Sequence, residues 1–294
     1  MWEEPPTRIG QMSKGVILTL IVLAVVFPLW VVVITSLSTQ EAINRAGGLV
    51  VIPTDVSLQA YREIFSGGVV TRAVMVSLGV TAIGTAFSLT VTVMAAYGLS
   101  RPGSLLHRPL LFTVLLTFLF VPGLIPTYLL VSSLGLIDSY AALILPTAVS
   151  AFNLVVMRSF FMGIPSELID SARIDGAGEF RILTRIVLPL SKAVTAVVGM
   201  FYAVGYWNAF FNALLYLHDN RKWPLQMVLR TYVLDAQHMP GVGASADADI
   251  VGGAVPTLAI RMAVVVIAIL PVLAIYPFVQ RHFTKGVIIG AIKG

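Results

Sequence analysis

The sequence predicts an all-α integral membrane protein with six transmembrane helices. Hydrophobic residues make up 57% of its 294 residues and charged residues only 11%, against roughly 25% charged residues in an average soluble domain. So little polar material cannot cover a soluble core of this size, and disordered chains are instead rich in charge. The chain has no cysteine and 4 histidines, which excludes disulfides and thiolate metal sites, and we expect no metal site.

The first three predicted spans lie in the N-terminal half of the chain. A helix needs ~20 apolar residues to cross a hydrocarbon core about 30 Å thick. Residues 15–37 carry no charge, are too long for the apolar part of a signal peptide and have no small-x-small cleavage site after them. Residues 73–99 form a second uncharged stretch, rich in Val, Thr and Gly. Residues 110–136 form the third, which Pro122, Gly123 and Pro126 are expected to interrupt.

The last three predicted spans follow in the C-terminal half. Residues 139–157 are bracketed by charged residues, and residues 193–217 form the fifth span. Residues 256–280 form the sixth, which contains a single charge, Arg261, near its start, where a long side chain can snorkel to the interface. We therefore expect residues 1–294 to form one transmembrane domain.

The distribution of Lys and Arg predicts the orientation in the lipid bilayer. Six spans place both termini on one side, and the loops and tails of that side carry 12 Lys and Arg residues against 6 on the other. Because cytoplasmic loops hold the excess of Lys and Arg, we expect both termini in the cytoplasm. The net charge of +5 then reflects membrane topology, and a nucleic-acid partner gains no support from it.

Two external loops are long enough to contact a partner. In residues 38–72, Asp55 or Ser57 can cap a short helix with apolar residues at helical spacing. Residues 216–255 contain a helix-compatible stretch, 225–234, followed by a tract rich in Gly, Ala and Asp. The tract suits contact with an external partner and equally suits a simple linker.

The cytoplasmic loop, residues 158–192, shows two helix signals. Ser166 is the expected cap of a short polar helix, and Gly176 can end it. A second helix is predicted over 179–187, before Leu188 and Pro189 open the fifth span. A rigid polar element of this kind suits docking to a soluble partner, whereas its charge content alone favours a solvated linker.

The spacing of the loop favours docking. Asp170-Ser171-Ala172 is followed by Gly176 six positions after Asp170, and Ile186-x-Leu188-Pro189 places Ile186 and Pro189 16 and 19 positions after it. This pattern resembles the loop signature of binding-protein-dependent ABC importer permeases. Asp170 and Ser171 stand where the family has Glu and Ala, which are small, shape-preserving differences.

Other segments are similar to the carbohydrate-uptake branch of that family. Asp175-Gly176-Ala177 and residues 57–61 resemble this branch, and residues 286–294 are similar to the C-terminal tail of its second permease subunit, of the maltose-transporter type. The resemblance implies the type I ABC importer permease fold in a bacterial inner or plasma membrane. It also implies a sister permease, two ATPase subunits and an extracytoplasmic sugar-binding protein.

The same resemblance implies that the chain is not an enzyme and holds no cofactor of its own. It lacks the Gly-x-x-x-x-Gly-Lys-[Ser/Thr] phosphate loop, so ATP and Mg are expected on the partner ATPase subunits. The implied ATPase-coupling residues are Asp170, Ser171, Ala172, Asp175, Gly176, Ala177, Ile186, Leu188 and Pro189 in the loop, with Lys285, Gly286, Gly290 and Lys293 in the tail.

Polar and aromatic residues inside the spans are candidates for a substrate path. They are Asn153, Tyr206, Trp207, Asn208 and Asn212. Amides pair with sugar hydroxyls and aromatic faces stack on sugar rings, although buried Asn also hydrogen-bonds between packed membrane helices. The expected cargo is an oligosaccharide or related sugar, and a peptide or a polyol phosphate is the alternative.

Two other classes of protein compete with a permease subunit. A secondary transporter would want an internal repeat or buried ionisable pairs, and only Arg261 is charged within a predicted span. An intramembrane enzyme would need convergent His, Asp or Glu side chains, and all four histidines fall in predicted loops. Both alternatives remain open at this point.

Overall fold

The computed structural model describes residues 8–66, 68–101, 106–120, 122–234 and 257–291. Within these ranges every named element is a helix, and an isolated antiparallel bridge between Ser38 and Val56 is the only strand-like pairing. The predicted all-α class is therefore confirmed. The chain divides into two compact units, a first unit of Met1–Thr71 with Leu229–Ile269 and a second unit of Arg72–Val228 with Leu270–Gly294.

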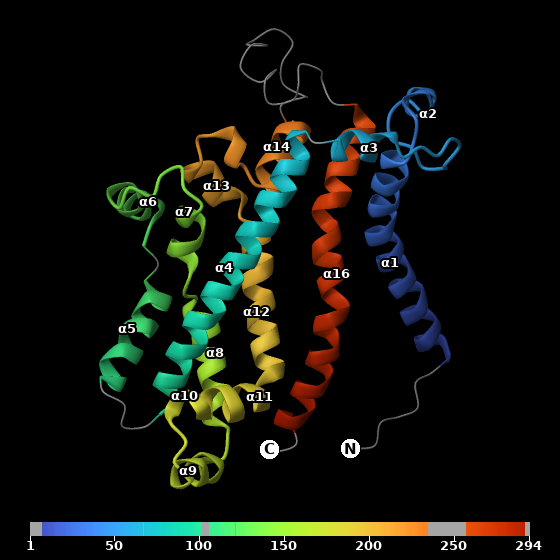
Figure 1. Cartoon of the computed structure of the whole chain (residues 1–294). Coiled ribbons are helices and arrows are strands. Elements are labelled where there is room, and N and C mark those ends of the chain that lie inside the picture. Colours follow the sequence, from blue (N-terminus) through green and yellow to red (C-terminus); the bar gives the residue numbers. More distant parts are fainter. Residues whose placement is uncertain (1–7, 67, 102–105, 121, 235–256, 292–294) are drawn as a thin grey trace. The chain divides into compact units, whose positions relative to one another are not determined.

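The first unit begins with α1 (Arg8–Ser36), which matches the first predicted span and is drawn in dark blue in Figure 1. Thr39 caps α2 (Gln40–Arg45) because its side chain accepts a hydrogen bond from the Ala42 N–H.

The short helix predicted in the first external loop forms as α3 (Gln59–Phe65). Neither expected residue is its cap, because Leu58 occupies the cap position and makes no side-chain capping bond. Ser57, one residue earlier, accepts the Gln59 N–H with its Oγ at 3.2 Å. Asp55 lies three residues before the cap position and forms an ion pair with Arg45, with 2.7 Å between its Oδ2 and Nη2.

The second unit is a helix bundle that includes nearly all of α4. Its other principal helices are α5 (His107–Leu119), α6 (Leu124–Ser133), α7 (Ala141–Ile144), α8 (Ala151–Met162), α12 (Lys192–Trp207) and α13 (Phe210–Tyr216). The second predicted span is confirmed as a continuous helix, α4 (Val69–Ser100), of 32 residues. Ala96 of α4, Met157 of α8 and Val198 of α12 are completely buried in one apolar core, so these three helices form its centre.

The third predicted span, 110–136, is interrupted at Pro122 and Gly123 as expected, whereas Pro126 lies within α6. It forms α5 and α6, of 13 and 10 residues, and neither alone can cross a 30 Å core. The helix stops at Phe120 because Pro122 has no N–H to continue the hydrogen bonding and disfavours helical backbone in the residue before it.

The fourth predicted span, 139–157, is bent, and the fifth, 193–217, is divided into α12 and α13, with a sharp bend just before it. Residues 141–147 and α8 meet at an angle of 53°, and the helical segment Glu179–Leu190 meets α12 at 88°. By length and composition, three helices of the described chain can cross a membrane, or five if each bent pair counts as one span. The count of six spans therefore stays a prediction.

The C-terminal part contains α14 (Leu225–Leu234), which confirms the predicted helix 225–234, and α16 (Leu258–Ala291). α16 extends well past the predicted end of the sixth span at residue 280. His282, which was expected in a loop, therefore lies within α16. His107 was also expected in a loop and is the first residue of α5. The Gly-, Ala- and Asp-rich tract lies outside the described residues.

Candidate functional site

The loop 158–192, which the sequence predicts to be cytoplasmic and which is called the docking loop below, forms a compact helical element at one end of the second unit. It contains α9 (Ser166–Ile174), α10 (Glu179–Ile182), the π-helix η2 (Leu183–Val187) and α11 (Leu188–Leu190). Figure 1 shows these helices at the lower end of the unit, opposite α13. The two predicted helices of the loop are thus both present.

The start of α9 differs from the prediction. Ser166 is the first helical residue and makes no capping bond, because Pro165 occupies the cap position and has no side-chain acceptor. The helix of the fifth span starts within one residue of its predicted start at Ala193, but Leu188 and Pro189 do not open it. The preceding helix continues through Leu188 and Pro189 to Leu190, and α12 starts at Lys192 after the 88° bend.

Gly176 ends α9 in the left-handed conformation, with φ of +78°. The Gly176 N–H donates to the Arg173 carbonyl at 3.0 Å, and the Ala177 N–H donates to the Ala172 carbonyl at 2.9 Å. This pair of bonds is a Schellman motif. Ala172 and Ala177 both pack against the apolar core, so the predicted coupling residues shape and anchor a rigid turn.

Among the other predicted coupling residues of the loop, Asp170 and Ser171 make local polar contacts. Asp170 forms an exposed 3.6 Å ion pair with Arg173, and the Ser171 Oγ donates to the Leu168 carbonyl at 3.2 Å. Asp175 is the C-cap residue of α9, and Ile186 lies within the π-helix η2.

Sequence reasoning missed two exposed apolar side chains beside this turn. Ile174 is 87% exposed and Phe180 is 76% exposed, on either side of Gly176. Two large apolar residues in the otherwise small and polar stretch 173–181 were the available signal. Their exposure gives the docking loop an apolar contact surface at its tip.

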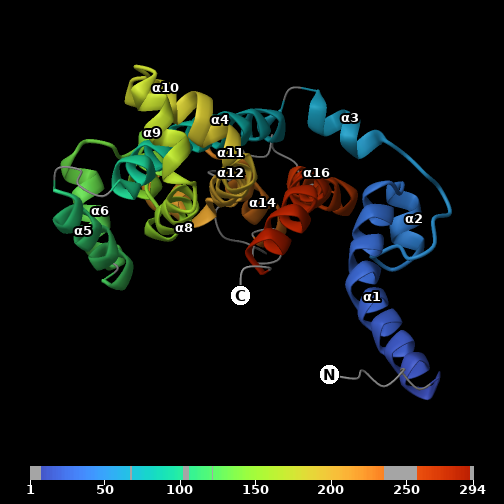
Figure 2. The ribbon, with the colours of Figure 1, turned by 90° about the horizontal axis from the view of Figure 1, so that it is seen from below.

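A second feature that sequence reasoning missed is the contact between the docking loop and α4. The Tyr97 hydroxyl donates to Glu179 Oε2 at 2.5 Å, and Arg173 donates to Glu179 Oε1 from Nη2 at 2.7 Å and from Nε at 3.1 Å. Figure 2 shows α9 and α10 close to α4, whose C-terminal end carries Tyr97. The hydrogen bond from Tyr97, followed by that from Arg173, lowers the pKa of Glu179 below its ordinary value.

A cavity of about 480 Å³ lies between α8, α12 and α13. Its lining residues are Thr147, Ser150, Phe152, Asn153, Phe201, Tyr202, Gly205, Tyr206, Asn208, Ala209, Phe211 and Asn212. Four of the five predicted path residues therefore line one cavity. The exception is Trp207, which is buried and does not line it.

Two tyrosines of α12 fix the wall of this cavity to α4. The Tyr206 hydroxyl lies 2.6 Å from the Ser88 Oγ, and the Tyr202 hydroxyl lies 2.7 Å from the Thr92 Oγ1. Ser88 and Thr92 are four residues apart on α4, as Tyr202 and Tyr206 are on α12. The two hydrogen bonds therefore join the helices on successive turns.

The same hydroxyls complete the hydrogen bonding of the break before α8. Tyr206 donates to the Ile144 carbonyl at 3.2 Å, and Tyr202 accepts the Ser150 N–H at 3.0 Å. These backbone groups lose their helical partners at the 53° bend, and such groups are costly to leave unpaired in a membrane. The described lining of the cavity offers aromatic rings, amides and hydroxyls and contains no charged side chain.

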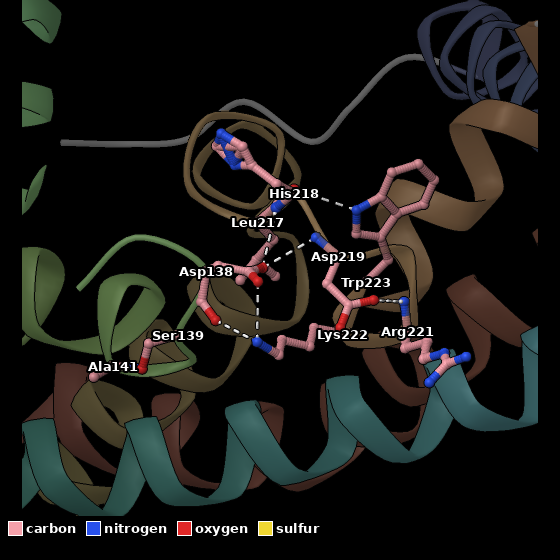
Figure 3. A network of polar contacts seen from close by, with 9 residues as sticks. All are labelled: Asp138, Ser139, Ala141, Leu217, His218, Asp219, Arg221, Lys222 and Trp223. Atoms are coloured by element: carbon pink, nitrogen blue, oxygen red, sulfur yellow. Dashed lines mark hydrogen bonds and ion pairs between the residues drawn. The ribbon is translucent and has the colours of Figure 1, made fainter. Parts of the chain in front are cut away.

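At the opposite end of the second unit, Asp138 joins two loops. Its Oδ1 accepts the N–H groups of His218 at 3.2 Å and Asp219 at 3.0 Å, and its Oδ2 lies 3.1 Å from the Lys222 Nζ. Figure 3 shows the Lys222 ammonium also directed at the Asp138 carbonyl, which it reaches at 2.7 Å. The Asp219 hydrogen bond, then Lys222, lowers the pKa of Asp138 below its ordinary value.

The predicted tail residues have only a backbone description. Lys285, Gly286 and Gly290 lie in the last turns of α16, and Lys293 lies outside the described residues. In the part of the chain that is described, no cluster of three His, Asp or Glu side chains is suited to hold a metal.

Comparisons with known proteins point to a transport family. Residues 88–289, more than half of the chain, match the family described as binding-protein-dependent transport system inner membrane component. The chain is 46% identical over 278 residues to the polygalacturonan/rhamnogalacturonan transport system permease protein YtcP of Bacillus subtilis (strain 168), which covers 94% of this chain and 96% of that protein. It is 31% identical to the sn-glycerol-3-phosphate transport system permease protein UgpE of Brucella suis biovar 1 (strain 1330), over 98% of this chain and 99% of the relative.

A solved structure resembles this chain over nearly its whole length. It is the crystal structure of a bacterial ABC transporter involved in the import of the acidic polysaccharide alginate. The TM-score is 0.84 and the sequence identity 28%, covering 96% of this chain and 99% of that one.

Proposed function

This chain belongs to the binding-protein-dependent transport system inner membrane components, and from that membership we propose that it forms, with a sister permease, the path of an oligosaccharide into the cell. It is a permease subunit of an ABC importer with the type I permease fold, a multi-pass protein of the bacterial inner membrane. It is not itself catalytic. In the proposal, two partner ATPase subunits bind ATP and Mg, and an extracytoplasmic binding protein delivers the sugar.

The oligosaccharide cargo is supported by the chemistry of the cavity. Amides of Asn153, Asn208 and Asn212 and the rings of Phe152 and Phe201 offer hydrogen bonds and apolar faces. A carbohydrate presents both hydroxyls and an apolar ring face, so it uses both kinds of group. The polysaccharide names of the relative YtcP and of the alginate importer agree with this cargo.

A polyol phosphate is the second candidate, because UgpE relatives carry sn-glycerol-3-phosphate in their names. Phosphate recognition in proteins relies on Arg, Lys or helix N-termini. Among the described residues, those lining the cavity include no Lys or Arg. The start of α8 at Ser150 also lines the cavity, but no cation lies beside it in the described lining, so the lining favours the oligosaccharide.

The docking loop is the proposed site of energy coupling. Its Schellman turn holds Ile174 and Phe180 exposed at the tip, where an apolar groove on an ATPase subunit can receive them. Of the coupling residues, Ala172, Gly176 and Ala177 build this turn. In the same proposal the tail residues Lys285 to Lys293 reach between the two ATPase subunits.

The topology of the proposal follows the Lys and Arg distribution. Both termini and the docking loop lie in the cytoplasm, with six spans in all. The external loop that begins at residue 216 then faces the binding protein. Two broken spans and the α5–α6 pair supply the crossings that are not straight helices.

Reconstitution tests the function directly. The complete complex is placed in proteoliposomes with its binding protein and offered a panel of oligosaccharides, peptides and glycerol phosphate. We expect ATP-dependent uptake of one oligosaccharide class and stimulation of ATP hydrolysis by the same ligand. Uptake of a peptide or of glycerol phosphate with no response to any sugar would contradict the cargo, and failure to co-purify with an ATPase would contradict the permease role.

A further inference from the structure

We propose that Tyr97 and Glu179 are a positioning pair that makes α4 follow the docking loop and thereby transmits loop movement to the cavity. The inference rests on the proposed coupling role of the docking loop. Neither residue belongs to the loop signature of the family. The proposal assigns them a role in coupling through contacts that this structure shows, without either residue touching ATP or solute.

The Glu179 carboxylate is shared between two helices. One oxygen accepts the Tyr97 hydroxyl of α4 at 2.5 Å, and the other accepts two N–H groups of Arg173 on α9. A hydrogen bond in which one partner is ionised is stronger than one between two neutral groups. All three bonds to Glu179 are of this stronger kind, because each uses its carboxylate. A displacement of α9 is therefore transmitted through Glu179 to the C-terminal end of α4.

Tyr97 is itself held in place at the end of α4. Its ring is buried to 8% exposure, and the Arg101 guanidinium lies 4.6 Å from the ring centre. Packing fixes the ring, so removal of the hydroxyl alone breaks the link to Glu179 and leaves the rest of the contact in place. Tyr97→Phe is therefore a clean test of the link.

α4 continues from this contact to the cavity as one unbroken helix. Ser88 and Thr92 of α4 bind the cavity tyrosines Tyr206 and Tyr202. Nine residues separate Ser88 from Tyr97, which is ~14 Å along the helix axis. The direct chain connection to α12 instead passes an 88° bend at Ser191, where the helix is interrupted. A straight helix fixed at both places moves as one body.

A double-mutant cycle tests the pair in the reconstituted complex. Tyr97→Phe, Glu179→Gln and the double variant are compared for stimulation of ATP hydrolysis by the liganded binding protein. Tyr128→Phe and Glu41→Gln are matched controls, because the Tyr128 ring stacks on Tyr216 independently of its hydroxyl and Glu41 is exposed on α2.

We expect each single variant to lower the stimulation about threefold or more, with the ATP concentration for half-maximal rate unchanged. The double variant should be no worse than Glu179→Gln, which also weakens the Arg173 contact, because the hydrogen bond between Tyr97 and Glu179 can be lost only once. Wild-type stimulation in both single variants, or losses that simply multiply in the double variant, would overturn the proposal. A wild-type chain that recruits no ATPase would overturn the proposed function instead.

A second measurement does not depend on transport. The same complexes without nucleotide are digested with trypsin, which cleaves after Arg181 and Arg185 in the docking loop. If the pair holds the loop against α4, both single variants are cleaved faster than the wild type and the two controls are not. Equal cleavage in all five proteins would overturn the proposal even where a variant assembles poorly.

Discussion

Gly84 of α4 lies directly against the ring of Tyr206. A Cβ atom at position 84 would stand 2.9 Å from two ring carbons of Tyr206, a distance that real Cβ contacts do not show. The absence of a side chain at Gly84 therefore lets α4 and α12 approach closely enough for the Ser88–Tyr206 hydrogen bond. Small residues at membrane helix interfaces commonly serve this purpose.

We predict that Gly84→Ala damages transport. The new methyl group must push Tyr206 away, and overpacking of this kind costs about 1–3 kcal/mol. Thermal stability of the purified complex and solute uptake are the measurements. Gly79→Ala is the matched control, because a Cβ there meets no atom within 4 Å and the residue lies in the same helix. Equal behaviour of the two variants would contradict the packing argument.

A second prediction concerns the turn of the docking loop. Gly176→Val forces a β-branched residue to a φ of +78°, and left-handed backbone costs an ordinary residue about 1–2 kcal/mol. We expect the variant to reach the membrane but to recruit less ATPase and to transport poorly.

Gly178→Val is the control for this prediction. Gly178 has an extended backbone, with φ of −70°, and a Cβ there meets nothing within 4 Å. Immunoblots of the membrane fraction and co-purification of the ATPase compare the two variants. Normal association in Gly176→Val would show that the geometry of the turn is not needed for docking.

A third prediction concerns Asp138 and pH. Because its pKa is lowered in the folded protein, its contribution to stability is complete above the pKa of the unfolded chain and is lost as the pH falls through the folded value. Asp138→Asn removes the charge facing Lys222 while tolerating the φ of +61° at this position.

Thermal melting between pH 7 and pH 3 measures this contribution. We expect the wild-type complex to be more stable than Asp138→Asn at neutral pH, and we expect the difference to shrink as the pH approaches 3. Asp55→Asn is a control in another exposed ion pair, with Arg45. A pH-independent difference between wild type and Asp138→Asn would contradict the assignment to the carboxylate charge.

Uninterrupted apolar runs identified α1 and α4 well, because in a membrane such a run has no alternative to the helix. The break before α8 was harder to foresee. Pro146 was a local signal of the break. The hydroxyls that bind the freed backbone groups belong to Tyr202 and Tyr206, more than 50 residues further along the chain. Contacts between residues so far apart in the sequence produce no periodic pattern of residue types from which they could be predicted.

The candidate sites show the same division. The Gly176 turn is a local device, so spacing alone located it. The Glu179–Tyr97 hydrogen bond joins residues 82 apart, and the loop sequence contains no sign of it. Tyr206 and Trp207 were indistinguishable as path residues, since only the packing of α12 decides which of two neighbours faces the cavity.

The last prediction uses a charge to identify the cargo. Asn212 lines the neutral cavity, and Asn212→Asp changes its shape little while adding a negative charge. An acidic oligosaccharide passing within about 4 Å would meet a repulsion of about 4 kcal/mol at an effective dielectric constant near 20, whereas a neutral sugar would meet none. We therefore expect the variant to lower uptake of uronate oligosaccharides far more than uptake of neutral ones.

Two variants separate charge from other effects. Asn212→Leu removes the amide without adding charge, so it should affect both sugar classes alike. Trp207→Phe alters a buried neighbour that does not line the cavity, and it should leave the ratio of acidic to neutral uptake unchanged. Uptake of each class into proteoliposomes gives that ratio for every variant. If Asn212→Asp left the ratio at its wild-type value, the solute would not pass this wall of the cavity, and the path would have to lie along another face of the permease pair.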